Sequence, residues 1–180
     1  MKFAVLIFLL VLGPVAAGIY GAFQDQIAYT VSPEFFTKFR FPIYNISGDT
    51  NPRLGAAIVG FKNSWQVGLL LGGILSLVGM IHYDWIKMLK HTAYAFVIAL
   101  TVAFVFSLIG LAMGAGDSEI SSSLNIIDKN HFLAVERMNN FSKMGGVIGM
   151  LLGIFYHVYS RNKDKGLIAP ITAGLSEDLR

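Results

Sequence analysis

Three histidines are the residues of this sequence that point most directly to chemistry, because imidazole nitrogens bind haem iron and other metals. His82, His91 and His157 each fall near the end of an apolar stretch. Two histidines on facing helices can supply both axial ligands of a haem, and His82 with His157 would be such a pair. No acid or cysteine completes a familiar metal-ligand spacing with them, so the sequence predicts no metal site. Tyrosines beside these histidines favour a place at the membrane interface instead. We therefore predict no cofactor, with haem b as the alternative.

The acids and serines between residues 116 and 143 do not form a catalytic pattern. The segment lacks an HExxH motif, and the serine run 121–123 has no nucleophile-elbow context. Nothing here combines a nucleophile, a base and an oxyanion-stabilising group. We predict a protein that is not an enzyme.

The segment from residue 24 to residue 44 reads QDQIAYTVSPEFFTKFRFPIY and is unusually aromatic. Ser32-Pro33-Glu34 is a helix-start signal: a capping hydroxyl, a proline at the first helical position and an acid in the first turn. The short helix that follows would lie along the membrane surface, where its phenylalanines must meet lipid, the bundle or a partner. An aromatic belt that only anchors the chain is the alternative. The candidates for partner binding are Asp25, Gln26, Tyr29, Ser32, Glu34, Phe35, Phe36, Phe39, Arg53 and Asn140.

The stretch QDQIAYTVSPEFFTKFRF resembles the signature of a family of small four-span bacterial membrane proteins, which reads approximately His-Asp-Gln, then Ser-Pro-Glu-Tyr-Phe-Thr-Lys-Phe. The segments PRLGAAIVG and MNNFSKMGG are also similar to that family. This sequence departs from the pattern at Gln24, which stands where the family has histidine. The resemblance implies a protein of the bacterial envelope and supplies no activity.

The composition is that of an integral membrane protein. Hydrophobic residues make up 54% of the 180 residues and charged residues only 14%, against about 25% charged residues in ordinary soluble domains. Cysteine is absent, which excludes a disulfide framework and a thiol nucleophile. The net charge of +3 comes from scattered basic residues rather than from a basic face, so we expect no nucleic-acid partner.

The apolar stretches predict a single membrane domain over residues 1–180, with four transmembrane helices. Each stretch approaches the length of about 20 residues that a helix needs to cross the hydrocarbon core. The fourth is short, and we expect its helix to begin near His131. We expect the first to be an uncleaved signal anchor, because it exceeds a typical signal-peptide core. The expected spans are about 2–23, 65–83, 92–115 and 144–159, and the expected outer loops are about 24–64 and 116–143.

Basic residues close to the spans predict the orientation. Cytoplasmic flanks carry an excess of lysine and arginine, and Lys2, Lys87 and Lys90 directly flank spans, as do the three basic residues after span four. We expect a multi-pass protein of the bacterial inner membrane with both termini in the cytoplasm.

Small residues recur every fourth position in all four spans and predict close helix packing. The stripe of the second span includes Gly68 and Gly72, and that of the fourth span Gly145, Gly149 and Gly153. The fold class is therefore an all-α, small-residue-packed bundle of four helices with an outward-facing aromatic loop.

These patterns favour an accessory or scaffolding subunit of a larger bacterial membrane complex, which docks a partner through its outer loops. The expected partners are membrane lipid and either other membrane proteins or further copies of the chain. A small transporter is the alternative, and a haem-binding electron carrier a further one; few polar groups lie within the spans, whereas a coupled transporter usually shows ionisable groups near the midplane.

Overall fold

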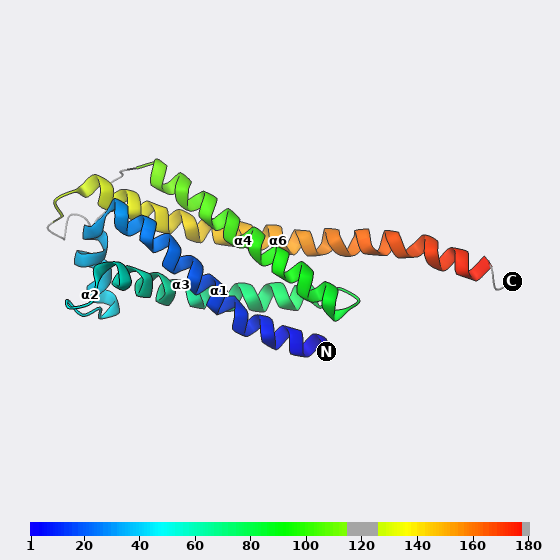
Figure 1. Cartoon of the computed structure of the whole chain (residues 1–180). Helices are drawn as coiled ribbons and strands as arrows, with labels where there is room; N and C mark the ends of the chain where they lie inside the picture. Colours follow the sequence, from blue (N-terminus) through cyan, green and yellow to red (C-terminus); the bar gives the residue numbers. More distant parts are fainter. Residues whose placement is uncertain (115–125, 178–180) are drawn as a thin grey trace.

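The computed structural model describes residues 1–114 and 126–177, with side chains described through Lys165. Helices hold 88% of the described residues, which contain no strand. Figure 1 shows long helices lying side by side, with α6 continuing past the others. The elements are α1 (Lys2–Val31), the π-helix η1 (Phe35–Arg40), α2 (Phe41–Tyr44), α3 (Pro52–Gly79), α4 (Trp85–Ala112) and α6 (Lys129–Glu177).

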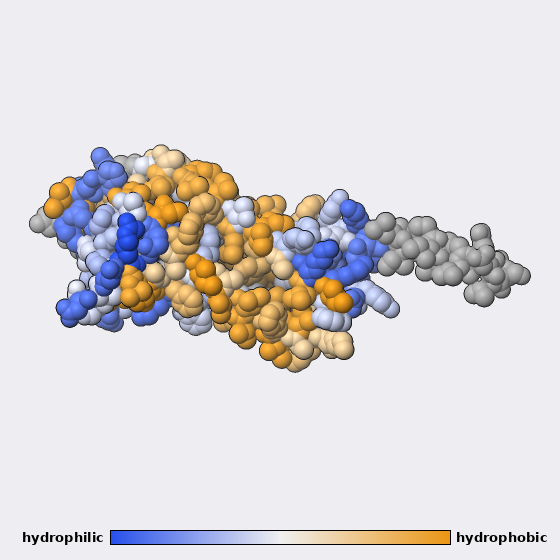
Figure 2. All heavy atoms as spheres, viewed as in Figure 1, coloured by the Kyte–Doolittle hydropathy of each residue, from blue (hydrophilic) through white to orange (hydrophobic). Residues whose placement is uncertain are grey.

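Three helices are long and apolar enough to cross a membrane: α1, α4 and the part of α6 from Lys129 to Lys165. They indicate a membrane protein. Figure 2 shows a broad apolar band across the visible face of the molecule, with hydrophilic residues gathered on either side of it. Helix α3 has 28 residues but is not among the three, because it carries polar side chains near its middle, such as Lys62 and Gln66.

The helices extend beyond the apolar stretches from which the spans were predicted. Within the expected loop 24–64, only residues 32–51 lie outside the long helices, and 129–143 of the expected loop 116–143 are helical. Residues 115–125 lie outside the described part of the chain. Hydropathy marks where a helix can meet hydrocarbon, whereas polar turns can continue the same helix into water.

The helices pack as two antiparallel pairs, α1 with α3 and α4 with α6. Glycine allows this close approach, because a Cβ at Gly13 would lie 2.6 Å from the carbonyl oxygen of Gly68. A Cβ at Gly149 would lie 2.7 Å from the Cα of Ala99. The stripes expected from the sequence thus lie at contacts within the pairs, while the two pairs touch each other much less. Gly72 lies across from Leu9 and Gly13, Gly145 across from Ala103, and Gly153 across from Ala95.

The two ends of the bundle differ, and we name them by their contents. The loop end holds residues 32–51 and 126–128, and the histidine end holds the turn 80–84 between α3 and α4. The amino-terminal residue Lys2 donates a hydrogen bond to the carbonyl of His82. The start of α1 therefore lies at the histidine end.

A core of aromatic and aliphatic side chains closes the loop end. Ser32 caps the turn that enters it, accepting a hydrogen bond from the backbone of Phe35 at 3.3 Å. Phe35 is 1% exposed and Phe36 is fully buried, and the ring of Phe35 packs edge-on against Phe132 of α6 at 5.1 Å between centroids. Phe39 is half-buried against the same core.

This burial corrects one expectation. Phe35 and Phe36 are not on a surface that a partner could contact, because their own bundle covers them. The ends of α1, α3 and α6 leave an apolar opening, and the segment after Ser32 folds back to fill it.

Candidate functional site

A cavity of about 320 Å³ lies between the two helix pairs. Ligand sites typically have volumes of about 300–1,000 Å³, so it is large enough for a small molecule or part of a lipid. All four long helices line it. The wall contains the small residues Ala17, Gly21, Ala103 and Gly146, and the larger apolar side chains Val67, Leu70, Leu71, Ile74, Leu100, Val147 and Met150.

The glycines of α6 explain why the helices part here. A Cβ at Gly145 would press on Ala103 and Phe106, whereas a Cβ at Gly146 would find no atom within 4 Å. The two neighbours therefore face different surroundings. Gly145 brings α6 against α4, and Gly146 leaves space on the side of α1 and α3.

Polar groups gather in the part of the cavity nearer the loop end. Ser142 donates to the side-chain oxygen of Gln24 at 2.9 Å, and its hydroxyl lies 3.3 Å from that of Tyr20. Asn139 and Lys143 of α6 line the same region. The cavity is therefore amphipathic, with a polar end and a long apolar wall.

Asp25 is the charged group of this cavity that is most deeply enclosed. It is only 5% exposed, and none of the described residues forms a hydrogen bond with its carboxylate. The positive charge that stabilises its ionised form is Arg40 of η1. The Nε of Arg40 is itself buried and lacks a hydrogen-bond partner among the described residues. A buried carboxylate without hydrogen bonds is costly, and a ligand that donates to it would offset that cost.

The other sequence-predicted site residues stabilise the loop end itself. Gln26 donates to the carbonyl of Arg53 at 2.9 Å, which joins α1 to the start of α3. The Arg53 guanidinium lies over the ring of Tyr29, 5.6 Å from its centroid. Asn140 is exposed on α6, and its side chain forms no hydrogen bond with the described residues.

Glu34 connects two segments that are far apart in the sequence. Its carboxylate accepts the backbone N–H groups of Ile127 and Asp128 at 3.1 and 2.9 Å, and it pairs with Lys38 at 2.6 Å. The hydrogen bond from the backbone of Asp128, followed by that from Lys38, lowers the pKa of Glu34 below its usual range. The glutamate of the Ser-Pro-Glu segment thus fastens this loop to the start of α6.

The histidine end contains a compact polar cluster. His82 Nε2 and His157 Nδ1 are 3.0 Å apart, and the rings of His82 and His91 stack at 4.4 Å between centroids. The contact between His82 and His157 leaves no space for an iron and its porphyrin between the two nitrogens. Binding of a haem b by His82 and His157 would therefore require the two rings to move apart.

The sequence analysis predicted Asp25 as a site residue but not the polar residues that line the cavity with it. Tyr20 and Gln24 lie one turn apart on α1, and Asn139 and Ser142 lie one turn apart on α6. These residues could have been found from the sequence, because polar residues at helical spacing next to an apolar run indicate a polar helix face. Comparisons of the chain with known protein families, with curated proteins and with solved structures found no match.

Proposed function

We propose that the chain is a four-span protein of the bacterial inner membrane, in which α3 crosses together with the three more apolar helices. Support for the fourth crossing comes from α3 packing antiparallel along α1 between the two ends of the bundle. A helix that accompanies a transmembrane neighbour over its length crosses the same layer. The polar side chains in the first half of α3, including Asn63 and Ser64, line the cavity, where they avoid lipid.

We place the histidine end and both termini in the cytoplasm. Lys2 and Lys87 cluster there with Arg161, Lys163 and Lys165, and cytoplasmic flanks of short loops are enriched in such residues. The loop end then faces outward. The test is a reporter that is active only on the outer side of the inner membrane, fused after Arg180. Activity of this fusion would contradict the proposed orientation.

The function that the cavity supports best is non-catalytic binding of an amphiphile. The observation that carries it is Asp25, a buried carboxylate at the polar end of an otherwise apolar cavity, with no hydrogen bond to any residue that the structure describes. A cationic or hydroxyl-bearing head group would donate to Asp25, and Lys143 is placed to attract a phosphate. The acyl chain would lie along Leu70, Ile74 and Met150. A zwitterionic aminophospholipid has all three parts.

The experiment measures the phosphatidylethanolamine that stays bound to the chain after purification in mild detergent from membranes that contain this lipid. Gly146→Leu extends a side chain into the cavity from a position where a Cβ meets no atom within 4 Å, and Asp25→Asn removes the charge. We expect both variants to lose the retained lipid. Thr101→Leu, on an exposed position of α4 outside the cavity lining, is the matched control and should retain it. Equal lipid retention in Gly146→Leu and the parent protein would refute the proposal.

A role as an accessory or scaffolding subunit remains our second proposal, with a membrane protein or another copy of the chain as partner. Phe35 and Phe36 are buried and cannot contact a partner, but Ile43 and Leu54 are each 56% exposed at the polar loop end. A contiguous exposed apolar patch rimmed by polar residues marks an interaction site, and we place such a contact at these two side chains. We expect Ile43→Ser with Leu54→Ser to abolish cross-linking to a partner while the helical content stays unchanged. Undiminished cross-linking would contradict docking at these residues.

Asp25 is also the residue that favours the alternative of a small transporter, because an ionisable group at membrane depth often marks a substrate path. The test uses liposomes that contain the reconstituted chain and a trapped substrate. Release of the substrate by the parent chain but not by Asp25→Asn would support transport over simple binding.

A further inference from the structure

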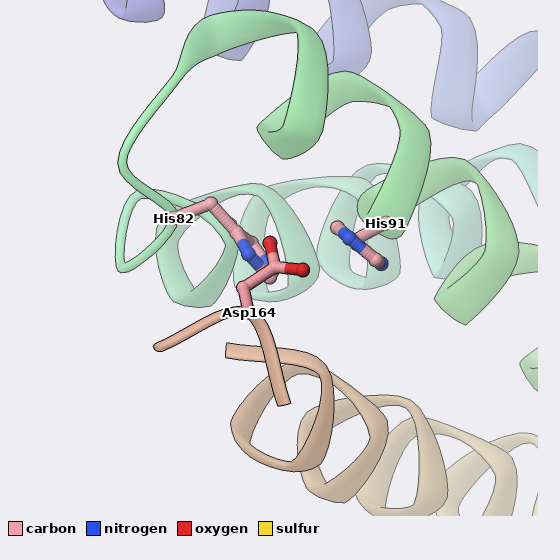
Figure 3. Close-up of side chains that lie close together, drawn as sticks. All are labelled: His82, His91 and Asp164. Carbon is pink, nitrogen blue, oxygen red and sulfur yellow. The ribbon is translucent and has the colours of Figure 1, made fainter. Parts of the chain in front are cut away.

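A second polar centre, at the histidine end, brings together side chains from three elements. His82 comes from the turn between α3 and α4, His91 from α4 and Asp164 from α6. One nitrogen of each ring and one carboxylate oxygen lie within 4.8 Å of one another. Figure 3 shows the Asp164 carboxylate beside the His82 ring, with His91 on the adjoining helix. The acid that local sequence spacing lacked is supplied by a residue two helical turns beyond His157.

We propose that His82, His91 and Asp164 form a binding site for a divalent transition-metal ion, with Zn²⁺ as the best match. Two imidazole nitrogens and one carboxylate oxygen are a donor set that zinc accepts, with a fourth position left to water. Imidazole also suits Ni²⁺ and Cu²⁺, whereas Mg²⁺ and Ca²⁺ prefer oxygen donors.

The geometry requires a modest contraction. Tetrahedral bonds of about 2.0–2.1 Å place neighbouring donor atoms about 3.3 Å apart, so donors now up to 4.8 Å apart would close by about 1.5 Å. Asp164 and His91 are only partly buried, and rotation of their side chains can supply that movement. The stacked rings of His82 and His91 must tilt toward each other.

The surroundings of the two histidines resemble those of metal ligands in one respect. Metal-bound histidines usually hold their other ring nitrogen in a hydrogen bond that fixes the ring. His82 has such a bond through Nε2 to His157, and His91 has one through Nδ1 to the Tyr156 hydroxyl, 3.1 Å away. The remaining nitrogens, Nδ1 of His82 and Nε2 of His91, form no hydrogen bond with the described residues. They are free to bind an ion.

Lys87 is the competing cation. Its ammonium group lies 2.8 Å from an oxygen of Asp164, on a side chain that is 42% exposed. An incoming metal would take over the carboxylate, and the lysine would turn outward into solvent. This competition separates a metal site from an ordinary polar contact. If the cluster binds metal, removal of the lysine charge strengthens metal binding.

A bound ion would also join the part of α6 around Asp164 to the turn between α3 and α4. That turn links the two helix pairs, which touch each other much less than the helices within each pair do. The metal would therefore stabilise the arrangement of the pairs at this end.

The test uses the full chain, purified in mild detergent with a tag that contains no histidine and stripped with a chelator. Zn²⁺ alone is then titrated in competition with a chromophoric chelator. We expect one ion per chain, binding at least ten-fold weaker in Asp164→Asn and His91→Gln, and several-fold tighter in Lys87→Met. Co²⁺ should give the visible absorption of a tetrahedral site in the parent protein and not in Asp164→Asn.

His131→Ala is the matched control, because His131 pairs with Asp128 at 2.6 Å at the opposite end of the bundle. It should leave Zn²⁺ binding unchanged. Binding that survives both Asp164→Asn and His91→Gln, or that weakens in Lys87→Met, would overturn the proposal. Asp164 is partly exposed, so its variant should keep the parent's helical content and elution volume, which separates lost binding from misfolding.

Discussion

The contact between α4 and α6 gives the sharpest stability prediction, through two glycines one turn apart. Alanine at position 149 would place a Cβ 2.7 Å from both the Cα and the carbonyl oxygen of Ala99. Unstrained carbon contacts begin at about 3.5 Å, so the two helices must separate locally by about 0.8 Å. Overpacking of this kind costs about 1–3 kcal/mol. Alanine at position 146 meets no atom within 4 Å and carries no such cost.

Both substitutions have the same effect on the backbone, since alanine favours a helix over glycine by about 1 kcal/mol. That gain cancels when the two variants are compared. We expect Gly149→Ala to be less stable than Gly146→Ala by about 1–3 kcal/mol. Gly153→Ala should fall between them, because its Cβ would lie 3.1 Å from a Leu75 methyl carbon and 3.2 Å from the backbone of Ala95.

The assay is unfolding by sodium dodecyl sulfate in mixed micelles, followed by circular dichroism, for the three variants and the parent protein. Equal stability of Gly149→Ala and Gly146→Ala would show that position 149 faces lipid rather than α4. Our account of the packing would then be wrong.

Three further predictions concern the loop end. The pKa of Glu34 is depressed in the folded protein. Its contribution to stability is therefore present above its unfolded pKa of about 4.3 and is lost as the pH falls through the folded value. Glu34→Gln should lessen this acid sensitivity in thermal unfolding between pH 7 and pH 3. Phe36→Ala should destabilise the chain by about 3–5 kcal/mol, while the exposed Thr37→Ala changes little, and equal losses in chemical unfolding would mean that Phe36 is not in the core. Ser32→Ala removes a cap and should cost about 1 kcal/mol, and unchanged protease resistance of the loop would contradict this.

The helices could be predicted from the sequence because apolar runs of this length have few alternatives. The start of α3 is also set by local residues, since Asn51 caps it by accepting from the backbone of Arg53 and Leu54 and proline occupies the first position. The burial of Phe35 could not be predicted in this way. Its ring meets Phe132, almost a hundred residues later, and local periodicity carries no information about that contact.

The polar centres show the same limit. Asp25 was a candidate residue, but its enclosure depends on two helix pairs that part at Gly146. The sequence does not predict that Asp164 lies near the histidines, because the expected fourth span ends at residue 159. In the structure α6 continues past Asp164 to Glu177. In both places the deciding contacts join residues from elements that are far apart in the sequence.

The pairing of helices that follow one another along the chain has a consequence for biogenesis. Helices α1 and α3 form their tight glycine contact from residues that precede Met80, so the first hairpin can assemble before the second has been synthesised. Domains and hairpins near the amino terminus generally form first during translation, and contacts between near neighbours in the chain form quickly. The second hairpin, α4 with α6, can then insert as its own unit. The slow step of maturation is expected to be the docking of two finished hairpins, and that step encloses the cavity.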